Sequence, residues 1–393
     1  MIIWLAMLIP VIACVFAMKY GGKKFVWWEF LLPTIGSFIL IAIIKFSTEA
    51  SQLHDIQYRG GIITQARYTE AWTTWVKRRC SRTTYTGSGK NRRSHTTYYD
   101  CSYCDEHAAY WEAIDDQGHT FSISEDKYNE LKKRWSAIPQ FVELNRDIRT
   151  KNGLFNSCGK DGDAYTVDWN KDMLTVETST WETSYENHVQ CSKSNFNIKE
   201  IDDEKAKKFG LYQYPAVDGY LQKVILGIDS LNFLQPQYKR GAEKMFEYFD
   251  GYYGPRRKIR VFILLFFNQP INIATKQKDY WVNGNKNEVV ICIDVDKNTG
   301  AINWVVPFSW TENKRIAVDL REDISNLKTL NFTSVYKVVE ESTKTFKYRD
   351  FSKFDYLSVD ASTGEIWAVY IITILATIGT LIYGYRNKYE QKD

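Results

Sequence analysis

Apolar and polar positions divide the chain into membrane-type runs near its two ends and a polar middle. Residues 2–18, 25–45 and 366–385 are almost entirely apolar, and only Glu29 and Lys45 within them carry a charge. A helix of about 20 residues is about 30 Å long, which matches the hydrocarbon core of a bilayer. The pattern therefore predicts three transmembrane helices, two near the start of the chain and one near the end.

A cleaved secretory signal is the alternative interpretation of the first run. No Lys or Arg precedes this run, and no small-x-small cleavage pattern closes it. A signal peptide has both features. We therefore expect the first run to remain in the protein as a membrane helix.

The charges beside the apolar runs predict which way the chain crosses the membrane. Positively charged residues of short loops favour the cytoplasmic side. Residues 360–365, just before the third run, are acidic or neutral instead. We therefore expect residues 46–365 outside the cytoplasm and the tail, residues 386–393, inside it. The positive flanks consist of Lys19, Lys23, Lys24, Arg386, Lys388 and Lys392.

Residues 46–210 have the pattern of short strands and turns. Val, Thr, Tyr and Trp, which favour strands, are frequent there. Asp-Asp-Gln-Gly at residues 115–118 has the chemistry of a hairpin turn. Ser124 is a good N-cap for a helix over residues 125–135. The pattern predicts a β-rich domain, with further strands at residues 166–169, 174–178 and 189–198.

Residues 216–365 have a different pattern. Residues 260–267, 288–295 and 301–308 are apolar runs typical of buried strands. Apolar residues have helical spacing over residues 241–249, before the first of these runs, and again over residues 271–281, after it. This order predicts helices packed on a mixed sheet. The expected fold class is thus a membrane-anchored α+β protein with a β-rich part and an α/β sandwich part.

The second part resembles the TPM-domain fold over roughly residues 218–325. The resemblance rests on the order strand, helix ending in Tyr280 and Trp281, turn over residues 283–287, strand, hairpin, strand. It implies an extracytoplasmic, membrane-tethered module, a kind that is in some cases linked to phosphatase activity or to the assembly of membrane complexes. No catalytic signature is matched residue by residue. The rest of the chain has the general look of a bacterial or phage envelope protein, and we expect it in a bacterial inner membrane.

Composition adds few constraints on function. The chain has 393 residues and a net charge of +4, which is too small to imply a nucleic-acid partner. P-loop, dinucleotide-binding, kinase and Ser-His-Asp signatures are missing from the sequence, and their absence argues against an enzyme.

Four residues in the polar middle have the spacing of a zinc knuckle: Cys80, Cys101, Cys104 and His107. A Cys-x2-Cys-x2-His run supplies three zinc ligands, and an earlier cysteine can supply the fourth. Disulfides are the alternative, because thiols outside the cytoplasm are usually oxidised. A bond between Cys80 and Cys101 would close the loop between them.

Three cysteines remain after this group and the one in the first apolar run. Cys158 and Cys191 are candidates for a further disulfide. Cys292 lies within an apolar run and is expected to be a buried free thiol.

A basic stretch without any acidic residue lies in the same loop. Such a stretch could bind lipid headgroups, an anionic surface polymer or an acidic partner protein. A solvated loop tip without a partner is the alternative. The residues are Lys77, Arg78, Arg79, Arg82, Lys90, Arg92 and Arg93.

Oxygen-bearing side chains lie at both ends of the apolar run at residues 288–295. Carboxylates and amides are the ligands of hard divalent cations, so this group is a second metal candidate. The residues are Asn285, Asn287, Glu288, Asp294 and Asp296.

These features together predict a membrane-tethered interaction or assembly protein of the cell envelope. The expected partners are membrane lipid and either another envelope protein or an anionic surface polymer. A membrane-anchored, metal-dependent hydrolase of the phosphatase type is the alternative, with zinc or another metal as its cofactor.

Overall fold

The computed structural model describes residues 2–20, 27–87, 92–144, 160, 162–191, 201–282, 284–357 and 363–389. Contacts divide the chain into two compact units. The first unit takes residues 1–57, 183–202 and 349–393, and the second takes residues 58–182 and 203–348. The domain boundary predicted near residues 210–216 therefore falls inside the second unit.

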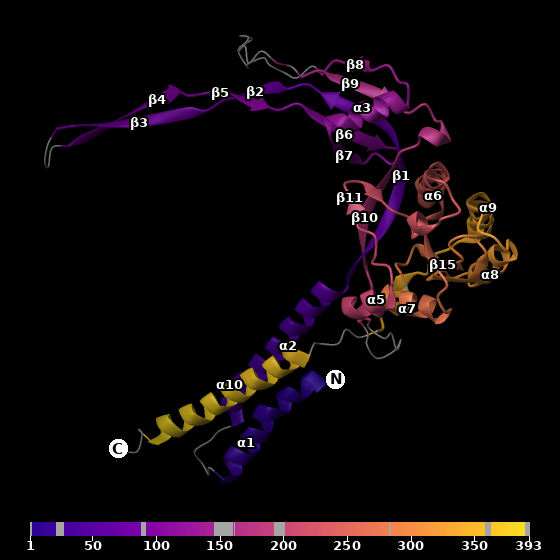
Figure 1. Ribbon diagram of the computed structural model, residues 1–393. Coiled ribbons are helices and arrows are strands. Elements are labelled where there is room, and N and C mark those ends of the chain that lie inside the picture. Colours follow the sequence, from indigo (N-terminus) through magenta and orange to yellow (C-terminus); the bar gives the residue numbers. More distant parts are fainter. Residues whose placement is uncertain are drawn as a thin grey trace. The chain divides into compact units, whose positions relative to one another are not determined.

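The first unit holds the apolar helices. Among the described residues, three helices are long and apolar enough to cross a membrane: Ile3–Tyr20, Trp27–Thr48 and Thr363–Arg386. Ile41 and Val369 are fully buried between them, whereas Leu32 is 80% exposed. Apolar side chains left exposed along such helices are what lipid would cover. The helical elements are η1 (Ile2–Met7), α1 (Leu8–Tyr20), η3 (Trp27–Phe30), α2 (Leu31–Gln52) and α10 (Thr363–Tyr389) (Figure 1).

The polar part of the first unit is organised around Asp55. Its Oδ2 accepts hydrogen bonds from the Tyr185 hydroxyl and from Asn187 Nδ2, both at 2.6 Å. Two short helices, α4 (His188–Cys191) and η8 (Phe351–Phe354), pack against each other nearby in the fold. The strand predicted for residues 189–198 is wrong at its start, because Val189 is buried within α4 and this packing outweighs its strand propensity. Residues 192–200 lie outside the described residues.

A six-stranded sheet forms the β-rich part of the described chain. The strand order is β7-β6-β1-β9-β8, and β10 also pairs with β1. The predicted hairpin at residues 115–118 is confirmed, because it joins β6 to β7. The strands are β1 (His54–Thr69), β6 (Tyr110–Asp115), β7 (Thr120–Ile123), β8 (Gln140–Val142), β9 (Ala164–Asp168) and β10 (Thr178–Glu186).

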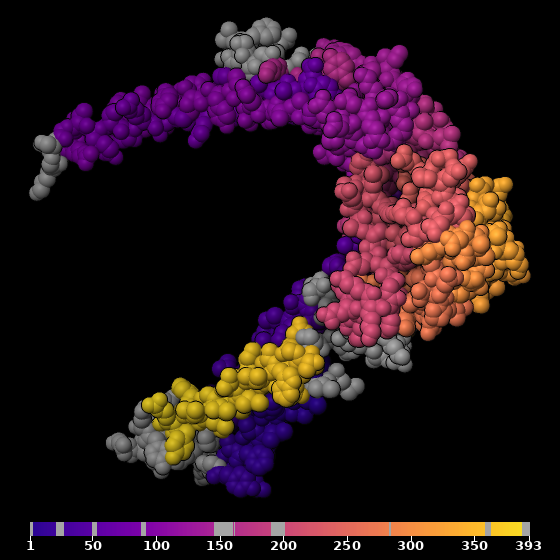
Figure 2. All heavy atoms as spheres, in the orientation of Figure 1, coloured from indigo at the N-terminus to yellow at the C-terminus, as the bar shows by residue number. Residues whose placement is uncertain are grey.

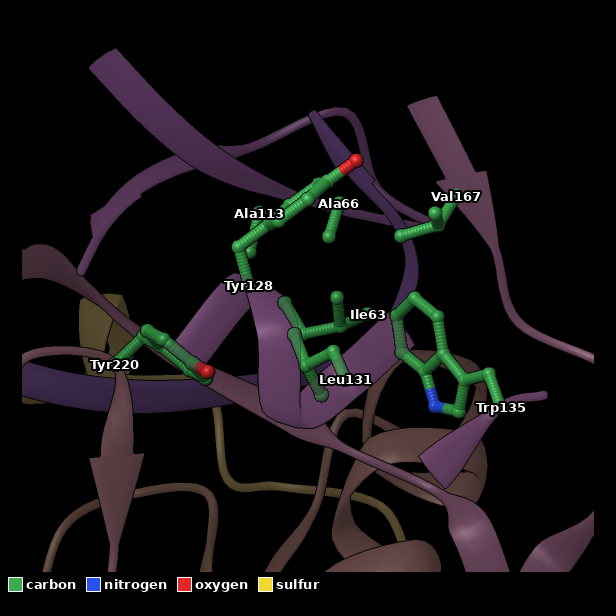
Figure 3. Close-up of a cluster of buried hydrophobic side chains, with 8 residues drawn as sticks. All are labelled: Ile63, Ala66, Ala113, Tyr128, Leu131, Trp135, Val167 and Tyr220. Carbon is green, nitrogen blue, oxygen red and sulfur yellow. The ribbon is translucent and has the colours of Figure 1, made fainter. Parts of the chain in front are cut away.

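Helix α3 (Glu125–Arg134) packs on this sheet. The Ser124 hydroxyl accepts the Lys127 N–H at 3.1 Å, which confirms the predicted N-cap. Leu131 and Trp135 are buried against Ile63 and Val167 of the sheet (Figure 3). The core of the β-rich part is therefore one helix on one sheet.

The strand predicted over residues 174–178 is wrong. The chain forms the 3-10 turn η5 (Met173–Thr175) there, and β10 begins only at Thr178. The Asp172 carboxylate accepts the Leu174 N–H at 3.0 Å, and this hydrogen bond caps the start of the turn.

The α/β part contains the predicted mixed sheet. Parallel strands β13, β14 and β15 are followed by antiparallel β16. Every residue of β14 and β15 is buried, as their continuous apolar sequences predict. The strands are β13 (Ile225–Leu226), β14 (Arg260–Phe266), β15 (Glu288–Val295) and β16 (Ile302–Ser309), and the helices are α6 (Pro236–Arg257), α7 (Asn272–Tyr280), α8 (Arg315–Asn326) and α9 (Phe332–Ser342).

Short elements connect these parts. They are α5 (Asp203–Phe209), β11 (Val217–Asp218), β12 (Leu221–Gln222), η6 (Ile228–Ser230) and η7 (Thr343–Thr345). β11 pairs with β12, and Thr180 of β10 donates its N–H to the Tyr220 carbonyl at 2.7 Å.

Glycines bring β1 of the sheet into backbone contact with helix α6 of the α/β part. A Cβ on Gly60 would lie 2.6 Å from the Asp250 carbonyl oxygen. A Cβ on Gly251 would lie 2.8 Å from the Gly61 carbonyl oxygen. Contacts this short exclude any side chain, so the two layers meet where only glycine fits.

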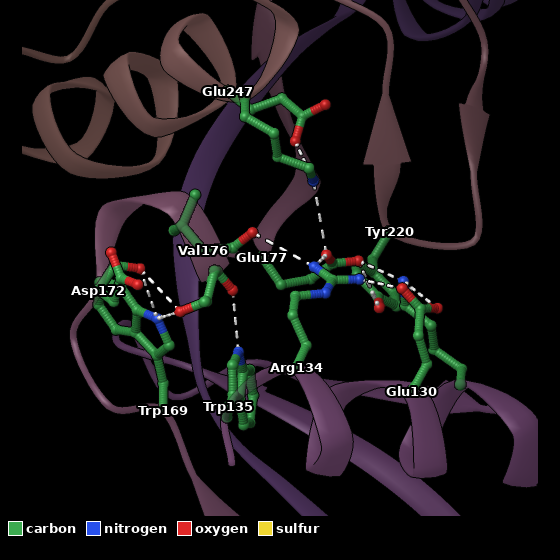
Figure 4. A network of polar contacts seen from close by, with 12 residues as sticks. Glu130, Arg134, Trp135, Trp169, Asp172, Val176, Glu177, Tyr220 and Glu247 are labelled. Carbon is green, nitrogen blue, oxygen red and sulfur yellow. Dashed lines mark hydrogen bonds and ion pairs between the residues drawn. The ribbon is translucent and has the colours of Figure 1, made fainter. Parts of the chain in front are cut away.

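A buried carboxylate reinforces the same junction. Glu177 is 1% exposed and forms ion pairs with Lys127 at 2.8 Å and Arg134 at 2.5 Å, both from α3, and with Lys244 of α6 at 3.6 Å (Figure 4). Burial alone would raise the pKa of Glu177, but the three cations outweigh burial and hold the pKa below its ordinary value. Glu177 therefore stays charged and ties α3 to α6.

We expect Gly60→Ala to destabilise the protein, because its methyl group would collide with the backbone of α6. Overpacking of this kind costs about 1–3 kcal/mol. Gly241→Ala, also on α6, is the matched control because nothing lies within 4 Å of its added Cβ. It should be neutral or stabilising, since alanine favours helix by about 1 kcal/mol. Thermal unfolding midpoints of the detergent-solubilised variants provide the measurement, and equal midpoints would contradict the close contact.

Candidate functional site

A long two-stranded arm extends from the β-rich sheet. β2 (Trp72–Val76) pairs with β5 (Tyr103–His107), and β3 (Arg79–Thr86) pairs with β4 (Arg93–Asp100) (Figure 1). The register stays constant along the arm, because each step along one strand is matched by one step back along the other. The pairs are Thr69 with Tyr110, Trp72 with His107, Val76 with Tyr103, Arg79 with Asp100 and Thr86 with Arg93. The arm is therefore one continuous hairpin rather than three separate ones.

The outer half of the arm is exposed on both faces. Every residue of β4 is exposed, and within β3 Cys80 alone is partly buried. Figure 2 shows the arm as a narrow projection from the rest of the second unit. At about 3.3 Å per residue, the stretch from Trp72 to Thr86 is roughly 45 Å long. An isolated two-stranded ribbon is marginally stable in water, so this one needs support beyond its backbone hydrogen bonds.

A disulfide between Cys80 and Cys101 supplies part of that support. It closes a loop with a sequence separation of 21 residues, and its Cα atoms are 5.8 Å apart, within the usual range. Closing a loop of this length stabilises the folded chain by about 3 kcal/mol in the chain-entropy account. The Thr83 and Thr96 hydroxyls, 3.1 Å apart, add a cross-strand hydrogen bond.

The zinc knuckle does not form. Cys80 and Cys101 are bonded to each other, and Cys104 is also disulfide-bonded. Cys104 and His107 lie three residues apart on strand β5, which directs their side chains to opposite faces. His107 instead stacks on Trp72 at 4.6 Å and contacts Thr74 Oγ1 at 2.8 Å. In the described part of the chain, no group of three or more His, Cys, Asp or Glu residues could hold a metal ion.

Of the predicted pair Cys158 and Cys191, Cys158 lies outside the described residues, and Cys191 is the last residue of α4. Cys292 is a fully buried free thiol in β15, as predicted, and burial raises its pKa well above the ordinary value.

The alternation of side chains along a strand sorts the basic residues onto two faces of the arm. On one face, Arg79 lies over the Tyr98 ring at 4.8 Å and Arg92 lies over the Tyr85 ring at 4.3 Å. On the other face lie Arg82, Arg93 and His95. The arm thus carries tyrosine-stacked arginines on one side and unstacked ones on the other.

Asp100 is the acidic neighbour of these cations, because it pairs in register with Arg79 and interacts electrostatically with Lys77. Among the described residues, no carboxylate oxygen lies within 4.0 Å of the cationic nitrogens of Lys77, Arg78, Arg79, Arg82, Arg92 or Arg93. Asp100 is the single acidic residue in the sequence from Lys77 to Asp100. Hydrogen bonds from Ser102 lower its pKa, so it remains ionised and bound to that residue. Lys90 lies outside the described residues.

The second metal candidate is split between the two ends of β15. At one end, Glu288 is buried and accepts hydrogen bonds from the Tyr214 hydroxyl and from the Asn285 N–H and Nδ2. Asn287 donates to the Tyr58 carbonyl at 2.7 Å. These hydrogen bonds already occupy both Glu288 carboxylate oxygens, whereas Asn287 Oδ1 is buried without a hydrogen-bond partner among the described residues.

The other end of the strand is about 20 Å away at 3.3 Å per residue. There, Asp294 accepts hydrogen bonds from the Gln269 N–H at 2.9 Å and from Asn303 Nδ2 at 2.7 Å. Asp296 lies in an exposed turn and accepts the Asn298 and Thr299 N–H groups. The five residues therefore do not come together as one site.

A buried charged cluster that the sequence did not indicate surrounds Arg260 of β14. Arg260 is 2% exposed, pairs in register with Glu288, and donates to Thr180 Oγ1 at 3.1 Å. Asp250 of α6 is 3% exposed and accepts the Val261 N–H at 2.9 Å. Among the described residues, Asp250 Oδ2 and Arg260 Nε have no hydrogen-bond partner. Complete burial raises the pKa of Asp250 to about 7, although Arg260 acts in the opposite direction.

Sequence reasoning also missed the tyrosines that hold the arm's arginines. Tyr85 and Tyr98 have strand propensity, but neither belongs to an apolar alternation that would mark a strand. The available signal was the run of Thr, Tyr and Arg on both sides of residues 87–92. That run has the composition of an exposed hairpin.

No family model, curated protein or solved structure matches the chain. The fold and the arm must therefore carry any inference about function.

The raised pKa of Asp250 predicts a pH dependence of stability. Between about pH 4 and pH 7 the folded protein holds a proton on Asp250 that the unfolded chain has lost. Stability should therefore fall as the pH rises through this window. Thermal unfolding of the detergent-solubilised protein from pH 4 to pH 8 measures the fall, and Asp250→Asn should flatten it.

Asp296→Asn is the control for this experiment. Hydrogen bonds from Thr299 and Asn298 lower the pKa of Asp296, so it titrates below the window and its replacement should leave the slope unchanged. Parallel curves for the parent protein and Asp250→Asn would show that Asp250 is ionised throughout.

Proposed function

We propose that this protein is a membrane-anchored binding protein of the cell envelope, which presents the arm outside the cytoplasm to an anionic partner. One observation carries the proposal: an exposed, disulfide-bonded ribbon whose described cations form no ion pair within 4.0 Å, although Asp100 pairs in register with Arg79. Cations that stabilise a fold are normally paired, as Lys127 and Arg134 are with Glu177. Unpaired cations on an exposed ribbon are available to another molecule.

The membrane anchor and the disulfides support the same location. Positive flanks beside the first and third helices favour the cytoplasm, which leaves the polar region on the other side. Disulfides persist in oxidising compartments and are rare in the cytosol. The bond between Cys80 and Cys101 therefore agrees with the orientation that the flanking charges favour.

The chemistry of the arm favours phosphate, sulfate or carboxylate groups on the partner. Five of the six described cations are arginines, whose planar guanidinium donates paired hydrogen bonds to such groups. The cations are distributed along the ribbon from Lys77 to Arg93 rather than gathered in a pocket. A linear anionic polymer can contact them in succession, so an anionic surface polymer is the partner we propose.

The metal-dependent hydrolase has no comparable support. The described residues contain no cluster suited to a metal ion, and Glu288, its expected ligand, is occupied by Tyr214 and Asn285. We therefore propose the binding function alone.

Neutralising the arm should weaken binding to anionic polymers. The full-length protein in nanodiscs is titrated with polyphosphate, heparin and polyglutamate, and affinity is measured by biolayer interferometry. Each cation near an anionic surface contributes about 1 kcal/mol. Replacing Arg79, Arg82, Arg92 and Arg93 by Gln should thus weaken binding to the preferred polymer at least tenfold, and added salt should reduce binding to the parent protein.

The control removes positive charge elsewhere on the second unit. One double variant, Lys133→Gln with Lys278→Gln, changes exposed residues of α3 and α7 and should leave affinity within about twofold of the parent protein. The matched double variant of the arm, Arg82→Gln with Arg93→Gln, should weaken binding more. Equal losses in the two double variants would show that net charge, and not the arm, determines binding. If the protein captured an acidic protein and bound none of the polymers, the partner would be an acidic protein and not an anionic polymer.

A further inference from the structure

A cleft lies between the β-rich sheet and helix α6, away from the arm. Its volume is about 660 Å³. This volume is in the range of small-molecule sites. The sheet contributes one wall, α6 contributes the other, and both belong to the second unit. The lining residues used below are Gln65, Asp116, Asp168, Lys171, Tyr252 and Arg256.

The glycine contact between β1 and α6 fixes the distance between the two walls. Gly251 lies on α6 between Tyr248 and Tyr252, which line the cleft, and Gly61 directly precedes Ile62 on its floor. Backbone contact at these glycines leaves little freedom for the walls to move. The cleft is therefore held open by the fold.

Two carboxylates on the sheet wall are held in place with one oxygen each to spare. Asp116 Oδ1 accepts the Ile62 N–H at 2.9 Å, and Asp168 Oδ1 accepts Gln65 Nε2 at 3.0 Å. Within the described chain, no hydrogen bond or ion pair engages the Oδ2 atom of either residue. Both side chains belong to exposed residues, so these oxygens can accept hydrogen bonds from a ligand.

Two cations balance these carboxylates. The Arg256 guanidinium lies over the Tyr252 ring at 3.8 Å, and Tyr252 stacks with Tyr248 at 5.4 Å. Lys171 lies at the end of the sheet wall, and the described residues offer its ammonium no acidic partner within 4.0 Å. Arg256 Nη1 already donates to the Tyr252 carbonyl at 2.5 Å, so the donors left for a ligand are the other guanidinium N–H groups and the Lys171 ammonium. The described lining therefore has fixed acceptors, these donors, an apolar floor of Ile62 and Ile114, and no net charge.

We propose that this cleft binds a neutral carbohydrate. A sugar hydroxyl both donates and accepts, so it can donate to Asp116 or Asp168 and accept from Lys171 or Arg256. The C–H faces of a sugar ring can pack on the apolar floor and the tyrosines. Because the lining has no net charge, it gives a phosphorylated ligand no net electrostatic attraction, and an apolar ligand would leave four charged groups desolvated and unpaired. This site is separate from the arm and does not depend on the arm's partner.

The test uses the full-length protein in nanodiscs. Neutral tetrasaccharides derived from glucan, mannan, galactan and chitin are titrated by isothermal calorimetry. At least one should bind, and Asp168→Ala and Tyr252→Ala should each weaken that binding about tenfold, because each removes a direct contact of the cleft. The matched control is Tyr238→Ala, which removes an exposed tyrosine of α6 that does not line the cleft and should leave affinity unchanged.

The thermal unfolding midpoint of each variant shows whether weaker binding comes from a lost contact or from a less stable fold. Because Asp168 is exposed, Asp168→Ala should unfold at the same temperature as the parent protein. Absence of binding by all four tetrasaccharides would overturn the proposal. Binding that survives both cleft variants would also overturn it, as would binding of acidic oligosaccharides in preference to neutral ones. None of these outcomes alters the expected binding of polyanions by the arm.

Discussion

One unbroken strand register holds the arm together and determines which side chains share each of its faces. The register runs from Thr69 and Tyr110 to Thr86 and Arg93 without a bulge. Because side chains alternate between the faces of a strand, it brings Arg79 to Tyr98 and sends Arg82 to the opposite face. A slip of one residue would exchange the two faces. The disulfide at Cys80 and Cys101 opposes such a slip, so the same bond that stabilises the ribbon also preserves the arrangement of its cations.

The positive charges of the chain serve two different purposes. In the body of the second unit, Lys127, Arg134 and Lys244 surround the buried Glu177, and together with the glycine contact they hold the sheet to α6. Burying that carboxylate would be costly without those cations. On the arm, the described cations face solvent or tyrosine rings instead. This contrast, rather than the modest net charge, is the reason we propose the arm as a binding surface.

Much of the fold could be predicted from the sequence, and the reasons differ from element to element. Continuous apolar runs marked β14 and β15, and the Ser124 cap marked the start of α3. The α8 and α9 helices were missed although Ile316, Leu320 and Ile324 have helical spacing. The β3–β4 ribbon could not be predicted from apolar periodicity, since neither of its faces is buried. Neither metal candidate comes together among the described residues. Spacing along the sequence does not show which face of β5 a side chain takes, or that β15 separates Glu288 from Asp294.

The arm is a disulfide-bonded ribbon, and we propose that it lies outside the cytoplasm. The redox state of Cys80 and Cys101 in cells tests the bond and the location together. Free thiols are blocked during lysis, the protein is purified from membranes, and its peptides are analysed by mass spectrometry before and after reduction. We expect Cys80 and Cys101 in one bonded peptide pair and Cys292 as a free thiol. Blocked, unpaired thiols at Cys80 and Cys101 would contradict the account, because the arm would then lack its covalent support and the evidence for an oxidising location would be lost.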